Sequence, residues 1–273
     1  MNELPPGLDL YFTLLIFLGG ACVGSFLNVC IHRIPRDESV IHPRSRCPSC
    51  RNMIAWYDNI PILSYLLLRG RCRHCGTTIS PRYALVEALT AVLFLGIWWI
   101  HGATVVTPLY LLVVSGLILA TFVDFEHMII PDRVSIGGMV AGLVLSAAFP
   151  VLHHVEGHLD GLLLSLIGLI TGGGSLWLVA VLGKMMFKKD AMGLGDVKLL
   201  GAIGAFMGWQ SVLFTIMISS LVGSVVGLTF IVSGRGEWQS RIPYGPYIAL
   251  AAVVWMLWGA EWWEAYIHWM SGG

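Results

Sequence analysis

The stretch from Gly193 to Trp209, GLGDVKLLGAIGAFMGW, places one aspartate, Asp196, between a pair of glycines and an apolar run. An ionisable side chain at the edge of hydrocarbon is costly, and it generally marks a site of function or a local charge pair. Gly193 and Gly195 carry no side chain, so a substrate backbone can approach the carboxylate beside them. The stretch therefore predicts a membrane helix that begins at a polar, functional edge.

Apolar runs of this kind recur along the whole chain of 273 residues, which is 56% hydrophobic and only 12% charged. The mean hydropathy is +0.78, outside the usual range of soluble domains. We therefore expect an all-α polytopic membrane protein, because roughly 20 mostly apolar residues form a helix that crosses a bilayer. About eight transmembrane helices are expected, with a tight turn between the sixth and seventh, at residues 9–31, 83–100, 106–123, 134–152, 160–186, 196–209, 211–232 and 244–262.

The basic residues are distributed unevenly along the chain. All 16 lysines and arginines fall in or border alternate connections between the expected helices. By the positive-inside rule these connections are cytoplasmic, which places both termini on the outer side of the membrane. The N-terminus lacks signal-peptide features, so the first apolar run is expected to remain as a membrane helix. Membrane lipid is an expected partner of the basic loops, and nucleic acid is not.

One polar segment, residues 32–82, lies between the first two expected helices and contains two Cys-x-x-Cys pairs. Such paired spacing is typical of a tetrahedral thiolate zinc site. We expect one structural zinc ion, since the segment is too short to build a core of its own and four thiolates leave no open position for catalytic water. Disulfides are the alternative, although a cytoplasmic loop is reducing. The four cysteines are Cys47, Cys50, Cys72 and Cys75.

A second aspartate, Asp124, lies where the apolar run of the third expected helix stops, on the same side as Asp196. Two carboxyl groups at one depth can share a proton. The ionised group then takes a proton from water while the neutral group polarises a scissile carbonyl, as in aspartic peptidases. The two aspartates are therefore the candidate catalytic pair.

Other readings of these acids remain open. Asp124 could pair with Arg133, and Asp196 could cap its own helix. Three further acids compete for the role of partner to Asp196. Helix N-capping accounts for the first of them, and solvated loop positions account for the other two: Asp132, Glu126 and Asp190.

Six blocks of the sequence, taken together, resemble the bacterial type IV prepilin peptidases. The match runs in order over nearly the whole chain, and the last block is the softest. The blocks are GSFLNVCIHRIPR (24–36), the four cysteines, RYALVEALTA (82–91), VDFEHMIIPD (123–132), GLGDVKLLGAIGAFMGW (193–209) and RIPYGPYIAL (241–250).

The resemblance implies an intramembrane aspartyl peptidase of the GxGD type, with Asp124 and Asp196 as catalytic residues facing the cytoplasm. Its substrates would be type IV prepilins and type II secretion pseudopilins, cut after a glycine. The new N-terminal residue would then be methylated from S-adenosylmethionine. No nucleotide-binding G-x-G-x-x-G motif identifies residues for this donor. The resemblance points to the basic loop, with the first helix and the zinc site, as the contributor.

The implied organisation has three parts, which are an N-terminal transmembrane helix at 1–31, a cytoplasmic zinc-binding loop domain at 32–82 and a seven-helix peptidase domain at 83–273. Glu87 and Lys198 are second-tier site candidates. Glu87 could instead pair with a loop arginine, and Lys198 could reach the lipid head groups.

Two rival functions belong to other classes. The chain could be an ion-coupled transporter that uses the two aspartates as a relay, although transporter sites lie near the bilayer midplane, often in repeated halves. It could also be a non-catalytic assembly protein of a secretion machine. Cleavage of a prepilin by the purified protein separates both rivals from a peptidase.

Overall fold

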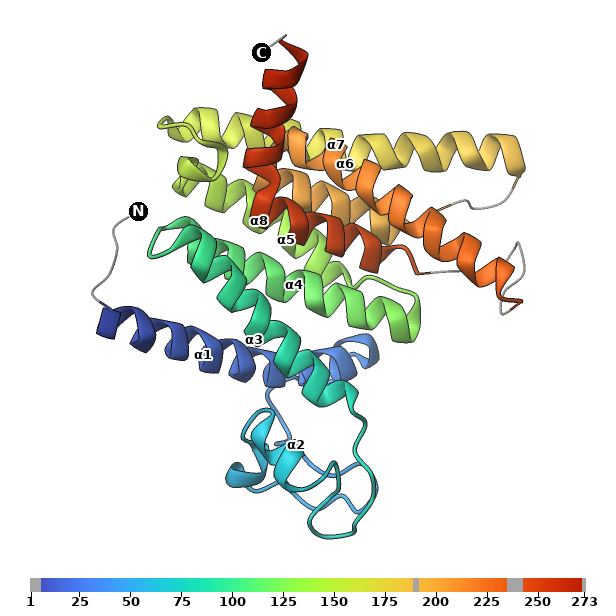
Figure 1. The fold of residues 1–273 in the computed structure, drawn as a ribbon. Coiled ribbons are helices and arrows are strands. Elements are labelled where there is room, and N and C mark those ends of the chain that lie inside the picture. The colour runs from blue at the N-terminus through green and yellow to red at the C-terminus, as the bar shows by residue number, and fades with distance from the viewer. Residues whose placement is uncertain (1–5, 189–191, 235–242, 272–273) are drawn as a thin grey trace. The chain divides into compact units, whose positions relative to one another are not determined.

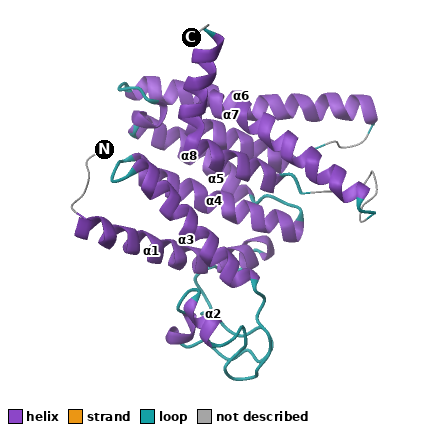
Figure 2. Cartoon of the chain, in the orientation of Figure 1, coloured by secondary structure: helices purple, strands orange, loops and turns teal. Residues whose placement is uncertain are grey.

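The computed structural model describes residues 6–188, 192–234 and 243–271, and every regular element in these ranges is a helix (Figure 2). The all-α fold class is therefore confirmed. The chain forms two compact units, Met1–Leu119 and Ala120–Gly273, whose boundary falls inside α4. In order, the longer helices are α1 (Pro6–Arg33), α3 (Arg82–His101), α4 (Val106–His127), α5 (Asp132–Ala148), α6 (His158–Phe187), α7 (Leu194–Val232) and α8 (Gly245–Met270).

Each of the eight expected helical segments overlaps an observed helix, and the sixth and seventh are the two arms of α7. The backbone of α7 leaves helical geometry at Gly208, where φ is 79° and ψ is 173°. A Cβ built on Gly204 would lie 2.9 Å from Cγ2 of Val212, whereas eight residues of straight helix span about 12 Å. The chain therefore turns back at Gly208, and the expected tight turn is confirmed. Figure 1 shows α7 in its two arms.

Five helices are long and apolar enough to cross a membrane, so the chain is a multi-pass membrane protein. The expected count of eight is not confirmed in the described part of the chain. One reason is that α5 has only 17 residues. A second is that α7 counts once despite its turn, and a third is that Glu261 and Glu264 lower the hydropathy of α8. Large apolar side chains on the long helices face outward, among them Leu18 and Ile170, as lipid-facing surfaces do.

In the first unit, α1 and α3 pack closely through glycines (Figure 1). A Cβ on Gly20 would lie 2.8 Å from Cα of Ala91, and a Cβ on Gly24 would lie 2.7 Å from Cα of Glu87. Small residues at such spacing allow two membrane helices to approach backbone to backbone. This close approach brings Ser25 of α1 beside Glu87 of α3.

The loop between α1 and α3 contains only short elements. They are the 3₁₀ turns η1 (Ile34–Arg36) and η2 (Trp56–Asn59) and the helix α2 (Leu63–Leu67). Within residues 34–81 the only buried residues are Cys47, Ser64 and Gly70. The loop therefore has almost no hydrophobic core.

In the second unit, α5 and α6 both pack against α7, with η3 (Pro150–His153) between α5 and α6. The hydroxyl groups of Ser146 in α5 and Ser165 in α6 both donate to the carbonyl of Ala205, at 3.2 and 2.6 Å. Gly168 of α6 lies directly against the Gly204 carbonyl. These contacts fix the first arm of α7, which begins beside Asp196.

Candidate active site and metal centre

The structure brings Asp124 and Asp196 together within the unit Ala120–Gly273, where their carboxyl groups interact electrostatically. Asp124 lies in the last turn of α4 and is 6% exposed. Asp196 lies in the first turn of α7 and is half-buried. A helix end and a helix start thus bring two carboxyl groups within electrostatic range of each other, and shared-proton chemistry requires two carboxyl groups that are close together. Their catalytic role stays a prediction.

The first residue of α8 holds the Asp124 carboxylate. The Gly245 N–H donates to Oδ2 of Asp124 at 3.0 Å, as one of the backbone donors that a helix start leaves unpaired. A Cβ on Gly245 would lie 2.8 Å from the same oxygen and 3.1 Å from Cδ1 of Ile130. Only glycine fits this position without displacing the carboxylate. The sequence marks a helix start here, because Pro243 and Pro246 flank Gly245, but the contact of Gly245 with Asp124 was not predicted.

The two glycines before Asp196 have different surroundings. Gly193 is the N-cap of α7, and a Cβ on it would lie 3.3 Å from Oδ2 of Asp196. A Cβ on Gly195 would lie 3.1 Å from Cβ of Ile130. The space beside Gly195 is thus taken by Ile130, a buried residue that also lies against Gly245. Ile130 therefore packs between the starts of α7 and α8, and no local sequence pattern indicates this contact.

The competing acids lie in different settings. Asp132 is the first residue of α5, with Pro131 as the N-cap, so the expectation that Asp132 is itself the cap is wrong. Its carboxylate accepts from Nζ of Lys198 at 2.6 Å. Lys198, a second-tier site candidate with the lipid head groups as its alternative, thus connects the first arm of α7 to α5. Glu126 is exposed, and Asp190 lies outside the described residues.

The four cysteines of the loop converge as the spacing predicts. Their sulfur atoms all lie within 4.8 Å of one another, and the Sγ atoms of Cys47 and Cys75 are 3.8 Å apart. A zinc ion bound at 2.3 Å by four thiolates would have sulfur atoms about 3.8 Å apart. The cluster can therefore hold one metal ion in a tetrahedron.

Two equivalent turns build this cluster. In the first, the N–H of Cys47 donates to the Asn52 carbonyl and the N–H of Arg51 donates to the Cys47 carbonyl, both at 2.9 Å. In the second, Cys72 and Gly76 repeat the same pattern with Thr77. Arg51 and Gly76 both have positive φ, at 60° and 69°. Each turn aims two sulfurs at one point.

The electrostatics of the cluster favour a cation at its centre. Backbone N–H groups, of Cys50 first and also of Ser49, lower the pKa of the Cys47 thiol to about 6. The pKa of Cys50 is instead raised to about 11, because burial and the neighbouring sulfurs outweigh the Asn52 N–H that favours its thiolate. The four sulfurs therefore cannot all ionise without a positive charge among them, and a metal ion supplies one.

Glu87 is buried in the first unit, and its Oε2 accepts the N–H of Ile62 at 2.7 Å. Ser25 hydrogen-bonds to the same carboxylate. The expected alternative was an arginine of the loop, and the contact that the structure shows is with loop backbone. Glu87 thus connects α3 to the loop after η2.

Comparison with known proteins gives independent evidence about the family of this chain. The bacterial peptidase A24 N-terminal domain matches residues 18–101, and the type IV leader peptidase family matches residues 111–228. A prepilin leader peptidase/N-methyltransferase of Myxococcus xanthus is 41% identical over 86% of this chain and 68% of its own length. Proteins of the same name match at 37% identity in Aeromonas hydrophila, over 94% of each chain, and at 35% in Pseudomonas aeruginosa, over 95% of this chain and 94% of the relative. No solved structure matches.

Proposed function

This chain belongs to the type IV leader peptidase family, and we propose that it is a bifunctional prepilin peptidase and N-methyltransferase. It cleaves the leaders of type IV prepilins and type II secretion pseudopilins after a glycine, and then methylates the new N-terminal residue. The observation that carries the proposal is the electrostatic interaction between Asp124, in the last turn of α4, and Asp196, in the first turn of α7. A full-length match to relatives of that name supports it.

In the proposed cleavage, the two aspartates have different roles in the attack of one water molecule on the scissile bond. The ionised carboxylate takes a proton from the water while the neutral carboxyl group donates a hydrogen bond to the scissile carbonyl. The water oxygen bonds to the carbonyl carbon, the C–N bond breaks, and the carboxyl group that took the proton from water passes it to the departing nitrogen. The N–H of Gly245 donates a hydrogen bond to Oδ2 of Asp124. We therefore propose that the other oxygen, Oδ1, is the one that contacts the water molecule.

The methyl transfer and the metal complete the proposal. S-adenosylmethionine would supply a methyl group to the amine of the new N-terminus. The transfer would exchange the S–C bond of the donor for an N–C bond, and the amine would give up a proton. We assign one structural zinc ion to Cys47, Cys50, Cys72 and Cys75, which supports the loop and takes no part in the chemistry.

We place the protein in the bacterial inner membrane, with both termini periplasmic and the aspartates facing the cytoplasm. The five apolar helices and the one-sided distribution of lysine and arginine support this orientation. A cysteine introduced at Ser39 should resist a membrane-impermeant thiol reagent in intact cells, and one introduced at His154 should react. Reaction of both positions from outside would reverse or break the orientation.

A direct test uses the purified protein with a prepilin and S-adenosylmethionine. Mass spectrometry should find a pilin shortened after its glycine that also carries one added methyl group. A transporter or a non-catalytic assembly protein would leave the prepilin at full length, and that outcome would refute the proposal.

Gly245 offers a further test of the arrangement around Asp124. The change Gly245→Ala puts a methyl group within 2.8 Å of Oδ2 of Asp124, so the carboxylate must move. We expect kcat for prepilin cleavage to fall by about a hundredfold, as for catalytic groups displaced by an ångström. Gly137→Ala in α5 is the matched control, because nothing lies within 4 Å of its Cβ. Equal rates in the two variants would show that the Gly245 contact is dispensable.

A further inference from the structure

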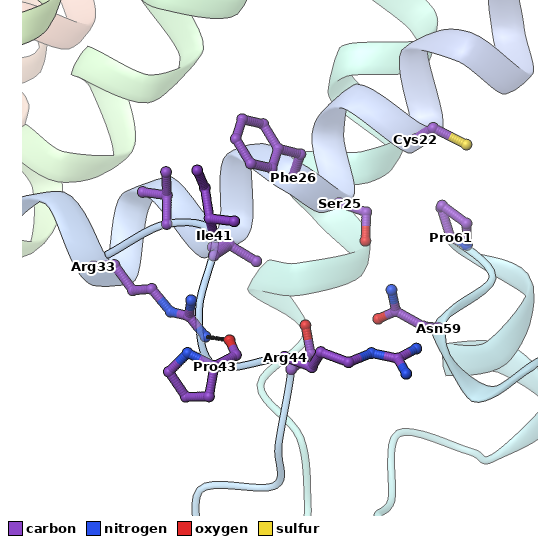
Figure 3. A pocket seen from close by; sticks show the side chains of 12 residues that line it. Cys22, Ser25, Phe26, Arg33, Ile41, Pro43, Arg44, Asn59 and Pro61 are labelled. Atoms are coloured by element: carbon purple, nitrogen blue, oxygen red, sulfur yellow. Dashed lines mark hydrogen bonds between the residues drawn. The ribbon is translucent and has the colours of Figure 1, made fainter. Parts of the chain in front are cut away.

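A cavity of about 330 Å³ lies in the unit Met1–Leu119, against the C-terminal half of α1 (Figure 3). Two stretches of the loop, residues 40–45 and 59–61, form its other walls. Small-molecule sites have volumes of about 300–1,000 Å³. The cavity is therefore large enough for a small organic ligand.

Buried polar contacts fix both loop walls. Arg33, 9% exposed, donates to the carbonyls of Ser39 and Pro43 at 2.8 and 2.7 Å, and Figure 3 shows the second of these bonds. On the other wall, Glu87 holds the N–H of Ile62, whose φ of 62° and ψ of −53° are unusual for a β-branched residue. Strained backbone of this kind persists only where its surroundings impose it, and it is common at ligand sites. The cavity is thus formed before any ligand arrives.

The lining of the cavity is amphipathic. In Figure 3 the Arg44 guanidinium, the Asn59 amide and the Ser25 hydroxyl lie on one side. The apolar side chains include Phe26, Ile41 and Pro61. No ion-pair partner of Arg44 is found in the described parts of the chain. Its charge is therefore available to an anionic group on a ligand that also has an apolar body.

We propose that this cavity binds S-adenosylmethionine, with Arg44 paired to its carboxylate and the apolar side chains against its adenosyl group. The donor combines a carboxylate, hydroxyl groups and a flat ring in one small molecule, which matches the three kinds of lining. The Asn59 amide can hydrogen-bond to the ribose, and the Ser25 oxygen, whose proton is donated to Glu87, can accept from the amine. This assignment rests on the proposed N-methyltransferase activity and adds the residues that hold its donor.

The test measures equilibrium binding of labelled S-adenosylmethionine and of adenosine to the full chain, purified in detergent with its metal. Arg44→Glu should raise the Kd for S-adenosylmethionine roughly ten- to hundredfold, the usual loss for a charged hydrogen-bonded pair. Adenosine has no carboxylate, so its Kd should not change in this variant. Arg46→Glu makes the same change of charge at an exposed residue outside the cavity lining, and it should bind the donor as the wild type does.

Three outcomes would overturn the assignment. They are equal donor affinity in the Arg44→Glu variant and the wild type, equal loss in the Arg44→Glu and Arg46→Glu variants, and parallel loss of adenosine in Arg44→Glu. Methyl transfer by the wild-type preparation is measured alongside, and its absence would refute the proposed function itself. Methyl transfer that persists while Arg44→Glu binds normally would refute only the cavity as the donor site.

Discussion

Asp124→Asn and Asp196→Asn are each expected to reduce prepilin cleavage by roughly a thousandfold or more. Asparagine keeps the shape of the side chain but cannot carry the exchangeable proton or act as the base toward water. The two carboxyl groups interact with each other, so loss of either one removes the pair. The measurement is the rate of leader removal from a purified prepilin, followed by mass spectrometry. Both variants should still methylate a pilin that has already been cleaved.

Asp132→Asn is the matched control for these variants. Asp132 is exposed, and its known contact is the ion pair with Lys198. Surface ion pairs contribute about 0–1 kcal/mol to the free energy of unfolding, so this variant should fold and cleave nearly as well as the wild type. A folded Asp196→Asn protein that still cleaves at a substantial rate would move the role to Asp132, Glu126 or Asp190.

Loss of the metal is the second large effect that we expect. Cys47→Ser or Cys72→Ser should abolish zinc binding and unfold the loop of residues 32–82. The loop buries only three of its residues between 34 and 81, whereas a structural zinc site contributes about 10–16 kcal/mol in small zinc domains. Elemental analysis should find one zinc per chain in reduced wild-type protein and none in either variant. Limited proteolysis should then cut the variants within the loop.

Cys30→Ala serves as the control for the metal. Cys30 is a buried cysteine of α1 outside the cluster, so the zinc content of this variant should match that of the wild type. Reduced, undamaged wild-type protein without bound metal would contradict the zinc assignment. A loop that resists protease in Cys47→Ser would show that the metal is dispensable for its structure.

Features set by local sequence patterns could be predicted. Apolar runs predicted the helical segments, and the short break at Gly208 predicted the turn in α7. The paired Cys-x-x-Cys spacing predicted the four-cysteine cluster. The number of spans could not be read in the same way, because a short helix such as α5 and a bent one such as α7 meet the length criterion differently.

Contacts between distant residues could not be predicted from the sequence alone. Gly245 reaches Asp124 across 121 residues, and Lys198 reaches Asp132 across 66. Neither pair forms a local pattern, because each contact depends on how whole helices pack. The cavity beside α1 is of the same kind, since α1 and two separate loop stretches build it. The sequence alone identified Asp124 and Lys198 as site candidates, but it did not predict that they contact Gly245 and Asp132.

The turn at Gly208 also has a consequence for the surrounding lipid. The arm of α7 from Leu194 to Gly208 has 15 residues by these bounds, which gives a length of about 22 Å at 1.5 Å per residue. The hydrocarbon core of a typical bilayer is about 30 Å thick. Residues 199–208 of this arm are all buried, so protein and not lipid surrounds the arm, and it can be shorter than the bilayer without hydrophobic mismatch. Cleavage in reconstituted vesicles should therefore be indifferent to acyl-chain length, and a strong dependence on bilayer thickness would argue against an arm surrounded by protein.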